Sequence, residues 1–247
     1  MLNLPKLIGH RGVKNLSPEN TIESINLAKG YGLNWVEIDV KISKDLIPII
    51  LHDDTLERTT NGKGLPVDFC YNELKKLDAG SFFYNKQTKI YIPTFEEILL
   101  LSQNKNISLN IELKPNKGFE RKNVESIAKI IKKSKFLNQY YFSSFDWDSL
   151  ILMKEILPNA NYGLLVHNFT KNRTINDIKT VANKYDFFCC GFNLDIINSE
   201  VINEILKNNL IITVYSKKNI KVSEANILWS NGIKSIFTDD PREYNLL

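Results

Sequence analysis

The sequence predicts a closed (β/α)8 TIM barrel, and three observations lead to this prediction. Short apolar runs alternate with amphipathic stretches, which favours a parallel sheet covered by helices. Eight such runs occur within 247 residues, a length that suits a barrel of eight strands. The rival is an open doubly wound sheet, which usually begins with a glycine-rich dinucleotide-binding turn. The Gly-His-Arg-Gly segment at 9–12 lacks that pattern.

Strands are expected where short apolar runs are bounded by turn residues. They fall at 4–9, 35–40, 107–112, 140–143, 162–165, 187–193, 211–215 and 235–238. Helices are expected where apolar residues recur at helical spacing, as Ile22 and Ile25 do. They fall at 21–29, 95–103, 121–133, 147–157, 176–184, 199–207 and 222–231. Asn198 or Ser199, and Ser223, are the expected caps of the last two helices.

The stretch at 53–91 interrupts this alternation with turn residues and several aromatic side chains. We interpret it as an insertion after the second strand that covers the top face of the barrel, within one domain spanning 1–247. Phe82, Phe83 and Tyr84 have two candidate roles in it. They form either an apolar wall for a substrate or, as is commoner for such residues, the small core of the insertion.

The composition limits the class of partner. The net charge of +4 is a small excess that weakly favours anionic small molecules and does not indicate nucleic acid. No apolar run approaches the ~20 residues of a transmembrane segment, and no signal-peptide pattern is visible. The three cysteines are Cys70, Cys189 and Cys190, and their odd number favours a reducing compartment. We therefore expect a cytoplasmic protein.

Charged side chains recur near the ends of the predicted strands. Glu37 and Asp39 alternate along the second strand, so both point to one face, and Glu112 and Lys114 repeat this spacing at the end of the third. His10 follows the first strand. Every candidate is therefore expected at a carboxyl-terminal strand end, where (β/α)8 enzymes build their active sites.

Carboxylates that point together repel unless a positive charge lies between them. Mg2+ and Ca2+ are hard divalent cations that prefer oxygen ligands. Glu37, Asp39 and Glu112 are therefore the predicted metal ligands. The alternative is that Glu37 or Asp39 forms a buried ion pair with Arg11 or Lys114.

Two of the three histidines, His10 and His52, lie in motifs with acidic neighbours. Because imidazole has a reference pKa of ~6.5, one ring can accept a proton from an attacking group while the other protonates a leaving oxygen. A metal ion, Arg11 and Lys114 would offset the charge of a phosphate ester. These residues predict metal-dependent cleavage of a phosphodiester. His167 lies in no motif and is assigned a structural or peripheral role.

Nine short motifs extend this pattern over nearly the whole chain. They are Gly-His-Arg-Gly at 9–12, Pro-Glu-Asn-Thr at 18–21, Glu-x-Asp at 37–39, His-Asp at 52–53, Leu-x-Arg-Thr-Thr at 56–60, Ile-Pro-Thr-Phe-Glu-Glu at 92–97, Glu-Leu-Lys-Pro at 112–115, Ser-Ser-Phe-Asp at 143–146 and Thr-Asp-x-Pro at 238–241. In this order they resemble the glycerophosphodiester phosphodiesterase family.

The resemblance implies a (β/α)8 barrel with an insertion after the second strand. It also implies hydrolysis of a small-molecule glycerophosphodiester to sn-glycerol 3-phosphate and an alcohol. The residue roles that it implies are an acid/base pair, three metal ligands and two phosphate contacts: His10 and His52; Glu37, Asp39 and Glu112; and Arg11 and Lys114.

One segment departs from the family pattern. Residues 215–218 read Tyr-Ser-Lys-Lys, where the family often has Trp-Thr-Val-Asn after the seventh strand. Tyr215 is therefore a predicted substrate-binding residue, with a change in packing alone as the alternative.

Two other functions are alternatives to glycerophosphodiester hydrolysis. One is a lysophospholipase D-like phosphodiesterase of the same barrel type. The other is a catalytically silent protein that binds glycerophosphodiesters. The presence of both motif histidines and all three carboxylates argues against the silent protein.

Overall fold

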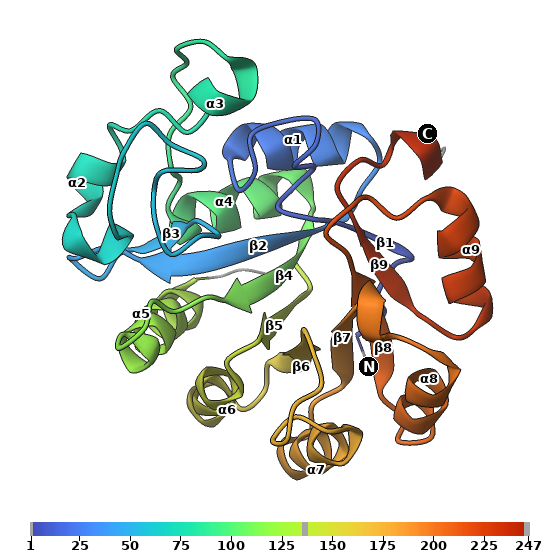
Figure 1. Ribbon diagram of the computed structural model, residues 1–247. Helices are drawn as coiled ribbons and strands as arrows, with labels where there is room; N and C mark the ends of the chain where they lie inside the picture. The colour runs from blue at the N-terminus through green and yellow to red at the C-terminus, as the bar shows by residue number, and fades with distance from the viewer. Residues whose placement is uncertain (1, 135–137, 245–247) are drawn as a thin grey trace.

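The computed structural model describes residues 2–134 and 138–244, and its centre is a closed parallel barrel (Figure 1). The eight barrel strands are β1 (Leu7–Gly9), β2 (Trp35–Ile42), β4 (Ser108–Leu113), β5 (Tyr140–Ser144), β6 (Asn161–Val166), β7 (Cys189–Asn193), β8 (Ile211–Tyr215) and β9 (Ser235–Thr238). Their order is β1-β9-β8-β7-β6-β5-β4-β2, and the pairing of Gly9 with Val36 closes the ring. The predicted (β/α)8 barrel is confirmed.

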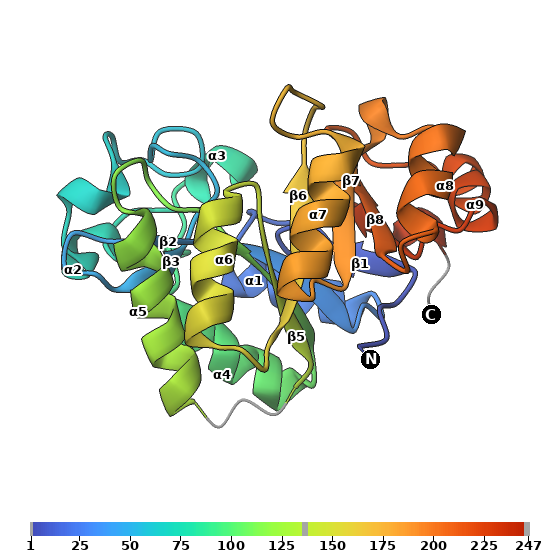
Figure 2. The same cartoon turned by 90° about the horizontal axis from the view of Figure 1, so that it is seen from below.

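Every predicted helix is present and packs outside the barrel (Figures 1 and 2). These helices are α1 (Ile22–Gly30), α4 (Phe95–Lys105), α5 (Glu120–Lys133), α6 (Trp147–Ile156), α7 (Ile175–Tyr185), α8 (Ser199–Leu206) and α9 (Val222–Ser230). Asn198 caps α8 by accepting a hydrogen bond from the Val201 backbone N–H. The predicted cap Ser223 is wrong, because it lies inside α9. Among the described residues, no helix is long and apolar enough to cross a membrane.

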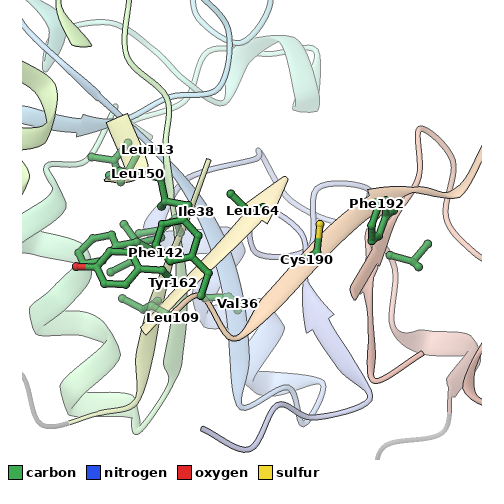
Figure 3. Close-up of a cluster of buried hydrophobic side chains, with 14 of the residues drawn as sticks. Val36, Ile38, Leu109, Leu113, Phe142, Leu150, Tyr162, Leu164, Cys190 and Phe192 are labelled. Atoms are coloured by element: carbon green, nitrogen blue, oxygen red, sulfur yellow. The ribbon is translucent and has the colours of Figure 1, made fainter. Parts of the chain in front are cut away.

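Two apolar cores hold the barrel because alternate residues of each strand point outward and inward. The outer core lies between strands and helices and includes Val36, Phe142 and Cys190 (Figure 3). The inner core gathers side chains near the beginnings of the strands, including Trp35 and Cys189. The polar side chains of the candidate site therefore lie at the opposite end of the barrel from this inner core, where the strands end.

The chain between β2 and α4 forms the insertion. It contains β3 (Pro48–Ile50), the 3-10 turn η1 (Pro66–Asp68), α2 (Tyr71–Leu74) and α3 (Ser81–Tyr84). Outside the insertion, two further 3-10 turns follow β7 and β9: η2 (Leu194–Ile196) and η3 (Arg242–Tyr244). β3 pairs antiparallel with β2 and was not predicted, since three residues are too short for a periodic signal. The insertion has its own core of Ile49, Leu51, Leu56, Tyr71, Leu74, Ala79 and Ile92. Its packing therefore begins before residue 53.

Both roles expected for the aromatic run at 82–84 are wrong. Phe82, Phe83 and Tyr84 are 63%, 41% and 42% exposed, so they do not form the core of the insertion. None of them lines the cavity of the candidate site. They belong to the four-residue helix α3, none of whose residues is buried.

Candidate active site

A tight turn after β1 positions the first two site residues. Arg11 and Gly12 both have left-handed backbone angles, with φ of 53° and 84°. A Cβ at Gly12 would come within 2.3 Å of the Ser24 Oγ, so this turn needs glycine there. The turn directs the Arg11 backbone N–H at Glu37 Oε2, 2.9 Å away. His10 and Arg11 are thereby fixed beside β2.

The three predicted metal ligands are brought together by strand register. Asp39 on β2 is the direct partner of Glu112 on β4, and Glu37 lies two residues earlier on the same face of β2. All three carboxylates are buried, and one ligand oxygen from each lies within 4.8 Å of the others. They form a candidate metal site.

The buried ion pairs considered as an alternative are also present. Lys114 Nζ lies 2.9 Å from Glu112 Oε1 and 3.3 Å from Asp39 Oδ1, and Arg11 Nε lies 3.4 Å from Asp39 Oδ2. These pairs do not satisfy the whole cluster. Within the described parts of the chain, Glu37 Oε1 is a buried oxygen without a hydrogen-bond partner, and Asp39 Oδ1 has no partner besides its ion pair with Lys114. Two cationic side chains beside three carboxylates leave one negative charge uncompensated when all are ionised, and a further cation would neutralise it.

The pKa shifts of the three carboxyl groups also favour a bound cation. Burial, together with the charges of Asp39 and Glu112, raises the pKa of Glu37 well above its usual range. Burial also raises the pKa of Glu112. For Asp39, burial opposes ionisation, but Lys114 and Arg11 hold its pKa well below its usual range. A divalent cation would relieve this repulsion, and the oxygen-only ligand set suits Mg2+ or Ca2+.

Asn20 holds one of these ligands in place. Its side-chain amide donates to Asp39 Oδ2 at 2.8 Å, and its Oδ1 accepts from the Asp39 backbone N–H at 3.2 Å. The N-cap of α1 is the next residue, Thr21, which accepts a hydrogen bond from the Ser24 backbone N–H. Asn20 therefore orients Asp39 through Oδ2, while Oδ1 faces Lys114 Nζ at 3.3 Å within the carboxylate cluster.

His10 is held by a carboxylate from the other end of the chain. Its Nδ1 lies 2.7 Å from Asp239 Oδ1, and Lys14 Nζ lies 3.2 Å from Asp239 Oδ2. Burial lowers the pKa of His10 to about 4, although Asp239 opposes this shift. Because a carboxylate accepts, Nδ1 carries the proton of the neutral ring and Nε2 is the free nitrogen. Sequence reasoning missed Asp239; its only signal was the Thr-Asp-x-Pro motif.

His52 is positioned by the short strand β3. β3 runs back along β2, and the Leu51 backbone N–H donates to the Asp39 carbonyl at 3.0 Å. His52 therefore follows an antiparallel return strand and not the end of a barrel strand. Its Nδ1 lies 2.6 Å from Asp53 Oδ1, so Nε2 is again the free nitrogen. Burial lowers the pKa of His52.

A charged network connects the two histidine-bearing segments. Arg58 donates to Asp53 Oδ1 at 2.9 Å and to both oxygens of Glu19 at 2.7 Å. Glu19 also accepts from Arg11 at 2.8 Å. The Arg58 side chain therefore links Asp53, the carboxylate that holds His52, through Glu19 to Arg11.

Replacing Glu19 with glutamine should weaken the protein in a pH-dependent way. Although burial opposes ionisation, hydrogen bonds and charges from Arg58 and Arg11 lower the pKa of Glu19 from 4.5 to about 2. Because the pKa of Glu19 is lower in the folded state than in the unfolded state, its ionised form stabilises the fold at pH values above the unfolded-state pKa of 4.5. This stabilisation is lost as the pH falls through the folded-state pKa of about 2. We expect Glu19→Gln to cost about 1–2 kcal/mol at pH 7.

Urea unfolding at pH 7 and pH 3 checks this prediction. The difference between the wild type and Glu19→Gln should shrink at pH 3. A difference that is equal at both pH values would show that the glutamate charge does not stabilise the network.

Replacing Asp239 with asparagine should slow the reaction while leaving substrate binding nearly unchanged. The change removes the charge and hydrogen bond that raise the pKa of His10 and fix its tautomer. We expect kcat to fall by about 10²–10³ with a small change in KM. The limb of the pH–rate profile that reports His10 should move to lower pH.

Asp240 provides a matched control, because its carboxylate pairs with Arg242 and not with a histidine. Asp240→Asn should keep the wild-type rate and pH profile. If Asp239→Asn changed the rate without moving the pH profile, a positioning role through His10 would be wrong.

One cavity of about 560 Å³ contains most of the predicted site. Its lining residues are His10, Arg11, Lys14, Glu37, His52, Asn110, Glu112, Lys114, Phe145, Leu165, His167, Tyr215, Ser216, Lys217 and Phe237. The cavity lies where the barrel strands end, which is the active-site face of (β/α)8 enzymes. Asp39 is buried beside Glu112 in the strand register.

The far wall of the cavity is aromatic. The Tyr215 hydroxyl donates to the Val166 carbonyl at 3.3 Å and lies 3.1 Å from His167 Nδ1, and its ring meets Phe145 edge-on at 5.6 Å. Tyr215 lines the cavity, and its substrate-binding role stays a prediction. His167 also lines the cavity, at an exposed position, and its structural or peripheral role stays a prediction as well. No motif surrounds His167 in the sequence that would have shown its place in the cavity.

The fold and the cavity define the class of protein: a (β/α)8 barrel hydrolase with an acidic cluster and two carboxylate-anchored histidines at its catalytic face. Residues 10–243 match the model of the glycerophosphoryl diester phosphodiesterase family. The chain belongs to this family and is a phosphodiesterase.

Individual relatives are similar to this chain over most of their length. A glycerophosphodiester phosphodiesterase of Bacillus altitudinis is 33% identical over 250 residues, which cover 96% of each chain. One of Bacillus subtilis is 30% identical and covers 95% of this chain and 83% of its own length. The structure of an Oleispira antarctica phosphodiesterase in complex with the product sn-glycerol-3-phosphate has a TM-score of 0.89 and 31% identity. It covers 97% of this chain and 94% of that chain.

Proposed function

We propose that the protein hydrolyses glycerophosphodiesters to sn-glycerol 3-phosphate and an alcohol, in a reaction that depends on Mg2+ or Ca2+. The observation that carries the proposal is the meeting of two Nδ1-anchored histidines with the carboxylate cluster in one cavity. The product bound to the Oleispira antarctica phosphodiesterase supports the choice of substrate.

The acidic cluster would hold the metal. Glu37, Asp39 and Glu112 supply the ligand oxygens, and the bound ion would stabilise negative charge on the phosphate. Arg11 and Lys114 lie against the same carboxylates, and their pKa values are raised despite burial, so both stay charged. They contact the phosphate oxygens and orient the diester.

His10 and His52 move the protons. Each ring presents Nε2 as its free nitrogen, because a carboxylate holds Nδ1. One ring is neutral and accepts the proton of the attacking oxygen at Nε2; the other enters the step as the imidazolium, protonated on both nitrogens, and donates its Nε2 proton to the departing alkoxide. Asp239 and Asp53 stabilise the positive charge that develops on the two rings. Tyr215 binds the substrate along the aromatic wall.

Product analysis tests this function. The protein is supplied with Mg2+ or Ca2+ and incubated separately with glycerophosphocholine and lysophosphatidylcholine, and glycerol 3-phosphate and choline are quantified. Equal release of glycerol 3-phosphate and choline from glycerophosphocholine supports the proposal. Faster cleavage of lysophosphatidylcholine would favour a lysophospholipase D-like activity. Binding of glycerophosphocholine without product over hours would indicate a silent binding protein.

A further inference from the structure

The insertion carries an exposed aromatic surface that the active site does not use. It consists of Phe82, Phe83 and Tyr84 of α3, named here the aromatic tip, whose side chains are 63%, 41% and 42% exposed. Phe83 and Tyr84 meet edge-to-face with ring centroids 5.0 Å apart. Exposing three consecutive large aromatic side chains is costly in water, so a surface of this kind commonly marks a binding face.

The tip is held rigidly in this exposed position. The buried carboxylate of Asp78 accepts hydrogen bonds from the backbone N–H groups of Gly80, Ser81 and Thr88 and from the Thr88 hydroxyl. The Ala79 backbone N–H also donates to the Ile90 carbonyl at 2.8 Å, which closes the loop below the tip. The aromatic side chains are therefore presented by a fixed loop, and docking orders little additional backbone.

The exposed charged side chains of the segment that carries the tip are positive, whereas the Asp78 carboxylate that precedes this segment is buried. Residues 79–95 contain no aspartate or glutamate. They do contain Lys86 and Lys89, and both are exposed. Aromatic side chains flanked by lysines match the interface of an anionic bilayer, where rings enter the headgroup region and ammonium groups meet phosphates.

The small size of the tip favours a lipid surface over a protein partner. A specific protein–protein interface takes about 20–30 residues from each side, whereas interfacial anchoring needs only a few apolar side chains with basic neighbours. Figure 2 shows α3 on the same side of the barrel as the connection between β6 and α7, away from the N-terminus. This is the side on which the barrel strands end, so docking by the tip turns the catalytic face toward the bilayer.

We propose that the aromatic tip docks this protein on anionic phospholipid surfaces. The experiment is cosedimentation of the whole protein with vesicles of phosphatidylglycerol and phosphatidylcholine, and with vesicles of phosphatidylcholine alone. We expect binding to the anionic vesicles that weakens as salt rises. Phe82→Ser/Phe83→Ser should lower the partition coefficient by about tenfold or more, and Lys86→Glu/Lys89→Glu should lower it as well.

Leu100→Ser is the matched control, because Leu100 is also 63% exposed but lies on α4 of the barrel. It should bind vesicles as the wild type does. All variants should hydrolyse soluble glycerophosphocholine at the wild-type rate, so binding is scored separately from catalysis. Absence of binding to anionic vesicles, or equal binding by the tip variants, would overturn the proposal. So would a wild-type dimer that Phe82→Ser/Phe83→Ser converts to monomer, because the tip would then join two copies of the chain.

Discussion

Replacing Glu37 with glutamine is expected to abolish metal-dependent activity and, at the same time, to stabilise the metal-free protein. The first effect follows because the variant loses one of three anionic metal ligands. We expect activity to fall by about 10³ or more. The second effect follows because the change removes one of three mutually repelling carboxylates. Glutamine retains an oxygen that can accept the hydrogen bond from the Arg11 backbone N–H.

The pH dependence of stability shows in which direction Glu37→Gln should change the stability of the metal-free protein. The pKa of Glu37 is raised in the folded, metal-free protein, so the folded state binds more protons than the unfolded state above about pH 4.5. The stability of the metal-free wild type should therefore decline as the pH rises above that value, and the decline should be smaller in Glu37→Gln. At pH 8 we expect the metal-free variant to be more stable by about 1–3 kcal/mol.

Thermal unfolding in EDTA, and then with Mg2+ or Ca2+, measures both effects. The wild type should gain stability when metal is added, and Glu37→Gln should not. Glu125→Gln, on the exposed face of α5, is the control and should behave as the wild type. If Glu37→Gln destabilised the metal-free protein and no metal shifted the wild type, Glu37 would be a purely structural residue.

Replacing either motif histidine with asparagine should remove nearly all activity without unfolding the protein. The amide of asparagine can still donate to Asp239 or Asp53, so the surrounding contacts are retained. General acid–base catalysis contributes about 10²–10⁴ per group, so we expect kcat to fall by about 10³ in His10→Asn and in His52→Asn. If both rings act in the same step, the double variant should be little slower than either single one.

His167→Asn separates proton transfer from simple lining of the cavity. His167 lines the same cavity, but its Nδ1 faces the Tyr215 hydroxyl instead of a carboxylate. We expect a rate change of less than about tenfold, mainly in KM. A loss in His167→Asn as large as in His10→Asn would mean that the proton-transfer roles are assigned to the wrong pair.

Strand periodicity is why the barrel and the carboxylate cluster could be predicted. Glu37 and Asp39 share a face because strand side chains alternate, and Glu112 ends the next predicted strand. Sequence spacing cannot show which oxygens lack partners, and this is the observation that favours a metal over ion pairs alone.

Contacts between distant segments could not be predicted. Asp239 meets His10 only because β9 pairs with β1, and these two residues are 229 positions apart. His52 depends on β3, which is too short to leave a periodic pattern. Likewise, apolarity alone suggested that Phe82 is buried, whereas the hydrogen bonds of Asp78 hold α3 away from the core of the insertion.

The central claim is that a metal held by the carboxylate cluster enables the histidines to cleave glycerophosphodiesters. Its most direct test is the rate of glycerol 3-phosphate release from glycerophosphocholine by EDTA-treated protein, as Mg2+ or Ca2+ is titrated back. Metal occupancy is measured in parallel by calorimetry. The account predicts negligible release without metal and a rate that rises in proportion to occupancy in the wild type, with neither rate nor heat in Glu37→Gln. Full release in EDTA, or unchanged release by Glu37→Gln, would contradict it.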